Sequence, residues 1–353
     1  MLVRSPNLLV SWKGTRLSVK NLEGGKGVLG TPALVELLDR FGEPSPEKEV
    51  ARGLEGYDRR SVEAAIRHLR GLGFLLPAAQ AARKTSHIDA WKQNLASVNY
   101  HLAVRNLRYV QGQTAINAFI RRRLSAERQP PRFKRYRRAA SSRRLSRAPL
   151  SSAATALRRV LEARRTVREF ARSAAPFEAF SEIVRGTWGK TGYLETGVLG
   201  RLTTKTSPSA GARHPIECYV LAWNVAGLTP GLYHYDVRAD ELRRLRSGDL
   251  RTEAVAAASG QKYVGRAAFL CIMTAVFART LWKYPTENAY RVVWLDAGHL
   301  AQTFCLLATS LGLGPFQTAA IQDSYIEKLI GLDGIKEFPV YLGGAGVPAK
   351  KLL

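Results

Sequence analysis

Cysteines, metal-binding motifs and long apolar runs are all scarce in this sequence of 353 residues. Its three cysteines, Cys218, Cys271 and Cys305, lie far apart in apolar segments, so we expect buried thiols and neither a disulfide framework nor a metal site. The six histidines show no HExxH or related spacing, which argues against zinc. The longest apolar run, residues 267–278, has twelve residues, where a bilayer span needs about 20. Without a signal-peptide pattern either, we expect a cytoplasmic protein with no membrane segment.

Acidic side chains are also in short supply. The chain has 54 Lys and Arg against 28 Asp and Glu, a formal charge of +26 that attracts polyanions or acidic peptides. Twelve of the basic residues fall between Arg121 and Arg147, with Glu127 as the one acid. Dense like charge with Pro-Pro and Ser-Ser pairs favours a solvated linker. Nucleic-acid binding by this stretch is the weaker alternative, because it has few aromatic residues and no nucleic-acid motif.

The length predicts two domains, and a composition of 46% hydrophobic and 23% charged residues is that of a globular protein. In the first domain, the pattern of residues 7–22 predicts a hairpin around Lys13-Gly14. Helical patterns over 31–42 and 58–73 and an apolar strand over 74–76 follow, which together predict a winged-helix-like fold. The predicted parts are a winged-helix-like module (1–85), a helix (86–113) with a basic connector (to 152), and a second domain (153–353).

Helical and strand patterns are interleaved in the second domain. Two helical patterns precede a loop over 203–215, and then come strand 216–223, a strand pair around Arg238-Ala239-Asp240, a buried strand over 267–277, a core helix over 295–314 and a strand over 338–346. This order predicts an α+β sandwich. No GxGxxG or GxxxxGKS follows a strand, so neither a dinucleotide fingerprint nor a P-loop is present.

Three stretches of this domain have the composition of a site for an anion and a flat ring. In residues 164–168, arginines flank Thr166 and can grip a phosphate together with its hydroxyl. Small residues within 207–215 let the backbone approach a flat ligand closely, and Pro208 and Pro215 hold the loop. Residues 312–316 end the core helix with glycines that cap it and expose amides. Each stretch alone is better explained by a simpler feature: a basic cluster, a surface loop and a helix terminator, respectively.

Taken together and in this order, the stretches RRTVREF, SPSAGARHPIECYV, GLYHYD, LWKYPTENAYRVVWLDAGHLAQ, LGLGPFQTAAI and LIGLDGIKEFPVYLGGAG resemble the FMN-dependent nitroreductase superfamily. They are most similar to its SagB-type branch, the dehydrogenases (azoline oxidases) of azole-forming peptide pathways. The resemblance covers about residues 155–348. It implies a nitroreductase-like α+β sandwich, with a central, mostly antiparallel sheet flanked by helices.

The resemblance also implies FMN bound at a homodimer interface. In relatives, the segment that corresponds to Arg164, Arg165, Thr166 and Arg168 holds the phosphate and ribityl side of FMN. A loop that corresponds to Pro208, Ser209, Ala210 and Gly211 reaches the flavin, often from the second subunit. The stretch that corresponds to Gly314, Pro315 and Phe316 lies along the isoalloxazine ring.

Lys283 and Tyr284 correspond to the lysine-tyrosine pair regarded as catalytic in SagB-type oxidases. Making an azole from an azoline removes a proton from the α-carbon and a hydride from its neighbour, so the reaction needs a base beside the flavin. The alternative is an amphipathic pair in which the tyrosine packs and the lysine reaches solvent. Asn288 departs from the basic residue common in relatives, which leaves the substrate open. We interpret Asp296 and His299 as a helix-start carboxylate and a core histidine.

The implied function is FMN-dependent oxidation of thiazoline or oxazoline rings in a ribosomally made peptide. The N-terminal module would bind a leader segment of that peptide by adding it as a strand, and a cyclodehydratase is a further expected partner. Two alternatives stay open: a flavin oxidoreductase acting with NAD(P)H on a nonribosomal peptide or small molecule, and a noncatalytic scaffold that binds nucleic acid or partner enzymes.

Overall fold

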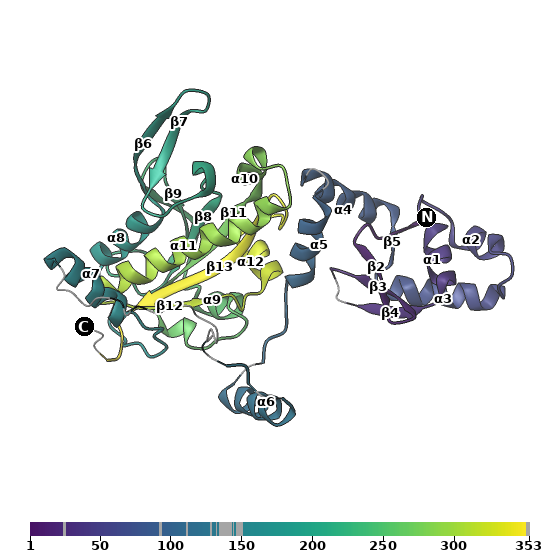
Figure 1. Cartoon of the computed structure of the whole chain (residues 1–353), viewed down its shortest axis with the longest axis horizontal. Helices are drawn as coiled ribbons and strands as arrows, with labels where there is room; N and C mark the ends of the chain where they lie inside the picture. Colours follow the sequence, from purple (N-terminus) through teal and green to yellow (C-terminus); the bar gives the residue numbers. More distant parts are fainter. Residues whose placement is uncertain are drawn as a thin grey trace.

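The structure is a computed structural model that describes residues 1–23, 26–91, 94–110, 112–127, 129–131, 133, 143, 145 and 151–350. Figure 1 shows a small N-terminal module at one side and a larger body that contains the C-terminal half of the chain, joined by helices. Much of the predicted basic stretch 121–147 lies outside the described residues.

The N-terminal module combines two small antiparallel sheets with three helices. One sheet has the order β2-β3-β4, and β1 pairs with β5. The predicted hairpin is confirmed, because Lys13 pairs with Arg16 across a turn in which Gly14 has a φ of 62°. The sequence pattern does not predict the short helix α2. The elements are β1 (Leu2–Arg4), β2 (Leu8–Lys13), β3 (Arg16–Asn21), β4 (Gly27–Gly30), α1 (Pro32–Asp39), α2 (Glu47–Gly53), α3 (Arg59–Gly71) and β5 (Leu75–Pro77).

The predicted single helix over residues 86–113 is wrong. The chain instead forms α4 (Ala78–Ala90), α5 (Leu95–Val104) and α6 (Gln113–Ala126). Arg105 has an extended conformation directly after α5, and Gly112 has a φ of 82° directly before α6. Both conformations interrupt a helix, and apolar periodicity does not reveal them because it reports only which face is buried.

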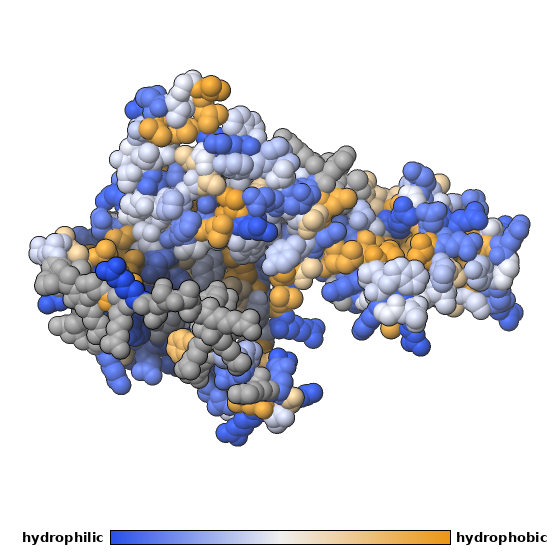
Figure 2. Space-filling model, in the orientation of Figure 1, coloured by the Kyte–Doolittle hydropathy of each residue, from blue (hydrophilic) through white to orange (hydrophobic). Residues whose placement is uncertain are grey.

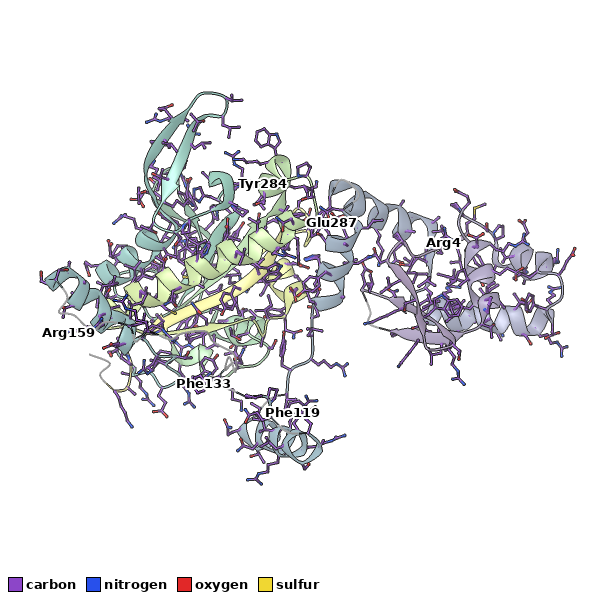
Figure 3. All side chains as sticks on the ribbon, in the orientation of Figure 1. Arg4, Phe119, Phe133, Arg159, Tyr284 and Glu287 are labelled. Carbon is purple, nitrogen blue, oxygen red and sulfur yellow. The ribbon has the colours of Figure 1, made fainter. Side chains whose placement is uncertain are left out.

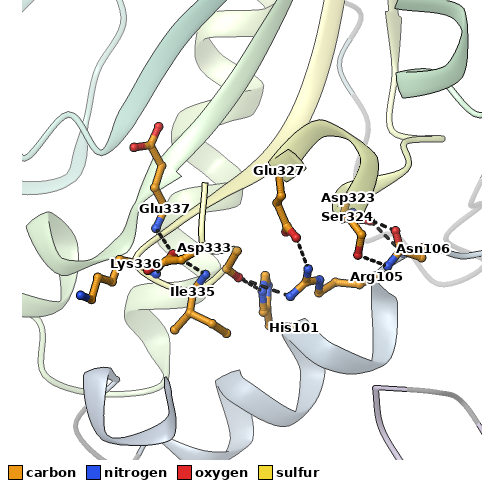
Figure 4. A network of polar contacts seen from close by, with 11 residues as sticks. His101, Arg105, Asn106, Asp323, Ser324, Glu327, Asp333, Ile335, Lys336 and Glu337 are labelled. Atoms are coloured by element: carbon orange, nitrogen blue, oxygen red, sulfur yellow. Dashed lines mark hydrogen bonds and ion pairs between the residues drawn. The ribbon is translucent and has the colours of Figure 1, made fainter. Parts of the chain in front are cut away.

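Helix α5 attaches the N-terminal part of the chain to the larger body through a buried polar network (Figure 4). His101 Nε2 lies 2.9 Å from Gly334 O, and its Nδ1 lies 3.1 Å from the Tyr290 hydroxyl. Arg105, one turn further along, forms an ion pair with Glu327. Burial, aided by the nearby Arg105 charge, lowers the pKa of His101 to about 3. This histidine is therefore neutral in the folded protein at neutral pH.

The larger body is a six-stranded antiparallel sheet with helices on both faces. Its strand order is β10-β9-β8-β11-β13-β12. Cys271 and Met273 of β11 pack into the core formed with α8 and α11, whereas Leu270 and Ile272 pack into the core formed with α9 and α12. Burial on both faces explains the unbroken apolar run. The sheet strands are β8 (Ile216–Ala222), β9 (Gly231–Asp236), β10 (Glu241–Ser247), β11 (Phe269–Val276), β12 (Gly314–Thr318) and β13 (Glu337–Gly346).

The predicted α+β sandwich is therefore confirmed, as are the strand pair β9–β10, the buried strand β11 and the final strand β13. The helices of the body are α7 (Ser152–Ala163), α8 (Phe177–Trp188), α9 (Arg251–Ala257), α10 (Phe277–Lys283), α11 (Asn288–Ser310) and α12 (Asp323–Ile330), with 3-10 turns η1 (Ala210–Ala212) and η2 (Val264–Arg266). No helix of the described residues is long and apolar enough to cross a membrane.

Three local predictions for the body are corrected. The loop expected over 203–215 begins inside a strand, because β6 (Lys190–Thr196) and β7 (Gly200–Lys205) form a separate hairpin. Helix α11 begins at Asn288, so Asp296 lies well inside the helix and not at its start. Gly312, with a φ of 76°, does end the helix region as predicted, but Gly314 already belongs to edge strand β12.

The buried neutral His101 predicts a specific acid sensitivity. The unfolded state binds a proton at this histidine below about pH 6.5, whereas the folded state does not until about pH 3, so folding stability falls as the pH drops through this window. The loss is at most about 1.4 kcal/mol per pH unit. Urea unfolding of His101→Gln, which does not titrate there, should depend less on pH between 6 and 4 than the wild type does. His68→Gln, on the exposed face of α3, is the matched control; equal pH profiles for all three proteins would contradict the assignment.

Candidate functional site

The structure brings two of the three predicted stretches side by side. Val167 N donates a hydrogen bond of 2.8 Å to Pro315 O. A Cβ built on Gly314 would lie 2.8 Å from Val167 Cβ, so glycine is what permits this approach. The rings of Phe170 and Phe316 meet edge to face at 6.1 Å. We call residues 164–168 and 314–316 the arginine group.

The arginine group offers a donor set suited to a phosphate. In the described part of the chain, the guanidinium groups of Arg164, Arg165 and Arg168 have no carboxylate within ion-pair distance. Among the described residues, the hydrogen bonds of the Arg165 guanidinium go to two backbone oxygens, those of Glu162 and Arg164. Arg168 lies over the Tyr263 ring at 5.4 Å. Three uncompensated cations beside the exposed Thr166 hydroxyl fit a phosphate monoester, which is recognised by such charge-assisted bonds.

The third stretch is attached elsewhere, to the middle of α11. Ser209 Oγ donates a 2.5 Å hydrogen bond to Asp296 Oδ2 and accepts one of 2.9 Å from His214 N. His299 is exposed, so its interpretation as a core histidine is wrong; its Nδ1 lies 3.3 Å from Pro208 O. Burial raises the pKa of Asp296, and the bond from Ser209 opposes the rise. This buried carboxylate therefore fixes the loop, a role that the helix-start interpretation missed; a lone acid amid the apolar residues of α11 was the available signal.

The predicted catalytic lysine lies against this loop. Gly211 has a φ of 61°, and a Cβ built there would lie 2.6 Å from both Cδ and Nζ of Lys283. A larger residue here would displace the end of the Lys283 side chain, and glycine adopts this backbone conformation without strain. Ala212 and His214, which follow, also have positive φ values of 52° and 45°. Such conformations persist only where the surrounding structure holds them.

Lys283 is the last residue of α10, and Tyr284 follows it directly. Both side chains are half-buried. Lys283 Nζ lies 5.7 Å from the centroid of the Tyr284 ring, which packs partly against the main core. We call residues 208–211 with Lys283 and Tyr284 the lysine group.

The two groups lie apart within one chain. The side-chain view labels Tyr284 at the end of α10 and Arg159 on α7 near opposite ends of the body (Figure 3). Burial raises the pKa of the Cys305 thiol to about 12, and the Arg164 charge opposes it, which places Arg164 near the C-terminal part of α11. The lysine group meets the helix at Asp296, nine residues earlier, or about 14 Å along the axis. No hydrogen bond or ion pair of the described residues joins the groups.

The fold and the site together define a class of protein. The sequence model of the Nitroreductase family matches residues 161–347, more than half of the chain. The chain belongs to the nitroreductase family, whose members are flavin oxidoreductases.

Individual relatives narrow this assignment. The chain is 34% identical to the nitroreductase-family protein MJ1384 of Methanocaldococcus jannaschii over 53% of this chain and 88% of that protein. It is 26% identical to the trifolitoxin operon protein TfxC of Rhizobium leguminosarum bv. trifolii over 82% of each chain. It is 34% identical to the trifolitoxin-processing protein TfxB of the same organism, over 41% of this chain and 40% of that protein. These relatives support the predicted SagB-type branch.

The Asp296 contacts predict how firmly the loop is held. Replacing Asp296 by Asn removes the charged acceptor of Ser209 Oγ, a loss of about 1.5–3 kcal/mol for a bond to a charged group. Hydrogen–deuterium exchange of residues 207–215 should then become faster, while exchange in β11 stays unchanged. Asp249→Asn, an exposed site, is the control. Unaltered exchange of the loop in Asp296→Asn would show that Asp296 does not hold it.

Proposed function

We propose that the protein is an FMN-dependent oxidase or dehydrogenase that converts thiazoline or oxazoline rings of a ribosomally made peptide into azoles. The observation that carries the proposal is the packing of Lys283 on Gly211, because it joins the predicted base to the predicted flavin loop. The relationship to a protein named for trifolitoxin processing supports a peptide as substrate.

The chain's own residues fit FMN in two places. The arginine group would hold the phosphate and the ribityl side through Arg164, Arg165, Thr166 and Arg168, and Gly314, Pro315 and Phe316 would lie along the isoalloxazine ring. Pro208, Ser209, Ala210 and Gly211 would reach the flavin from the partner of a homodimer. In a homodimer, the lysine group of the second copy would complete the flavin site formed by the arginine group of the first, although the two groups lie apart within one chain.

When bound, FMN supplies the acceptor for the two electrons that leave the ring. The protein's task is to take the proton from the α-carbon. Lys283 Nζ is one candidate base; its side chain lies against Gly211, and Nζ lies 5.7 Å from the centroid of the Tyr284 ring. The Tyr284 hydroxyl is the second candidate, next in sequence on the same turn. Which of the two accepts the proton depends first on its distance from the α-carbon of the bound ring and then on its own protonation state.

Peptide recognition would fall partly to the N-terminal module. Strand β2 is an edge strand of its sheet, and most of its residues are exposed. An edge strand presents unpaired backbone groups to which an extended leader segment can be added. Since a net charge of +26 favours acidic segments, the leader would be drawn to the enzyme before the ring reaches Lys283. A cyclodehydratase would supply the azoline.

Flavin binding is tested by removing two guanidinium groups of the arginine group. Arg164→Ala combined with Arg168→Ala should raise the dissociation constant for FMN about 100-fold or more, since each bond to a charged group contributes about 1.5–3 kcal/mol. Flavin fluorescence titration measures it. Arg159→Ala, an exposed arginine one turn before the group on α7, should bind FMN like the wild type. Purified wild type that neither carries nor takes up FMN would overturn the proposal.

Catalysis is tested with a thiazoline peptide and mass spectrometry. The wild type should produce a loss of two daltons, and Lys283→Met should slow it about 100-fold, because general base catalysis contributes about 10²–10⁴. Methionine keeps an aliphatic stem over Gly211, so flavin content should not change. Lys328→Met, exposed on α12, is the control. Full activity of Lys283→Met would exclude Lys283 as the base, and rapid flavin reduction by NADPH without azole formation would favour a reductase.

A further inference from the structure

A cavity of about 910 Å³ lies between the β6–β7 hairpin and the larger body, beside the lysine group. It is walled by the hairpin, the loop after Gly211, strands β8 and β9 and helix α10. Six Lys and Arg side chains but only two acids line it. The basic residues are Lys190, Arg201, Lys205, Arg213, Arg238 and Arg279.

Both acids of the cavity are neutralised by neighbours. Burial alone would raise the pKa of Glu217, but the bonds from His234 and Arg279 lower it to about 2. Asp236 pairs with Arg243 at 3.4 Å and accepts the backbone N–H of residue 238. No ion pair of the described residues joins either carboxylate to Lys190, Lys205, Arg213 or Arg238.

Four of these cations therefore lack a carboxylate partner among the described residues: Lys190, Lys205, Arg213 and Arg238. Lys190 Nζ donates to Arg238 O, and Arg213 Nε donates to Gly211 O. Lys205 is half-buried, and this burial lowers its pKa to about 8, whereas the nearby Glu217 charge opposes the shift and the Arg279 charge adds to it. An anion that entered the cavity would relieve this unfavourable concentration of positive charge.

Apolar and aromatic surface separates the cations. Tyr193, Leu202, Val237 and Trp282 belong to the lining, and the Tyr193 and Trp282 side chains are 48% and 61% exposed. The apolar tip of the hairpin beyond them is visible at the top of Figure 2. A compact phosphate needs donors that converge on one point. Cations dispersed among aromatic side chains instead suit an extended peptide with several carboxylates, because aromatic residues carry much of the binding energy at peptide contacts.

Two residues of the cavity lining, Arg213 and Trp282, lie close to the predicted base. Arg213 lies two residues after Gly211, on which the Lys283 side chain packs, and Trp282 immediately precedes Lys283. The Arg213 guanidinium lies over the Trp282 ring at 5.5 Å, so this pair forms the border between cavity and base.

We propose that this cavity binds an acidic segment of the substrate peptide, with its carboxylates at Lys205 and Arg213, and so guides the neighbouring ring to Lys283. The proposal rests on the proposed function and adds a specificity site to it: acidic residues near the ring are selected by the enzyme's own cavity, separately from leader binding at the N-terminal module.

The test uses the full-length flavin-loaded protein and two fluorescein-labelled peptides. The peptides are identical except that four Glu residues of the first are Gln in the second. At 150 mM salt, the variant with Lys205→Gln and Arg213→Gln should bind the Glu peptide about tenfold more weakly, as judged by fluorescence anisotropy, and the Gln peptide unchanged. Lys328→Gln with Lys336→Gln removes the same charge from exposed positions away from the cavity lining and should change binding less than twofold. Lys205→Arg should keep the affinity and shows that the position tolerates replacement.

Equal weakening by both double variants would mean that only the general positive field acts, and would overturn the proposal. Displacement of the Glu peptide by NADPH at equal concentration, lost in the cavity variant, would also overturn it in favour of a nucleotide phosphate. The proposed function is scored separately with the thiazoline peptide. Azole formation together with equal binding of the Glu and Gln peptides would contradict the cavity proposal alone. Selective binding of the Glu peptide without azole formation would contradict the proposed chemistry and still support the acidic-segment site.

Discussion

Helix α11, packed on one face of the central sheet, is the element on which both halves of the candidate site depend. Its buried residues, among them Val293 and Phe304, lie in the main core with strand β11. From this fixed position Asp296 holds the 207–214 loop, and Ala301 O accepts a bond from Gln317 of β12. Close packing makes a helix of this kind difficult to move, so the spacing of the two groups is set by the core and not by the loops.

Electrostatics divide the surface of the larger body into regions with different tasks. The arginine group has uncompensated cations beside a hydroxyl, which suits a compact dianion. The hairpin cavity has uncompensated cations spread among aromatic side chains, which suits a longer acidic chain. On the side where α5 docks, by contrast, charge is paired: Arg105 is bonded to Glu327 next to the neutral His101. Charge is therefore paired where it is buried beneath α5, and the more exposed cations of the described residues lack carboxylate partners where a ligand is expected.

Much of the fold could be predicted because apolar patterns report burial. The alternation around Gly14, the run that became β11 and the strands flanking the turn at residue 239 all follow from it. The helix breaks around α5 and the β6–β7 hairpin could not be predicted from apolar patterns. Gly112 interrupts the helix through its backbone conformation, and the hairpin strands pair with each other and not with the central sheet. For the candidate site, the order of the motifs along the sequence predicted which segments contribute residues to it. The role of Asp296 depends on which loop folds onto it, and sequence spacing carries no such information.

The separation of the arginine and lysine groups bears on the proposed homodimer. They meet α11 around Cys305 and Asp296, so the point midway between them falls near residue 300. The exposed side of the helix there includes Gly298, where a built Cβ would meet nothing within 4 Å, and Leu295, an apolar residue 55% exposed one turn earlier. A two-fold axis perpendicular to α11 and passing beside its exposed side at this point would run two copies of the helix antiparallel and bring the arginine group of one against the lysine group of the other. Isologous contact of this kind produces two identical sites from one self-complementary surface, and neither would be complete in a monomer.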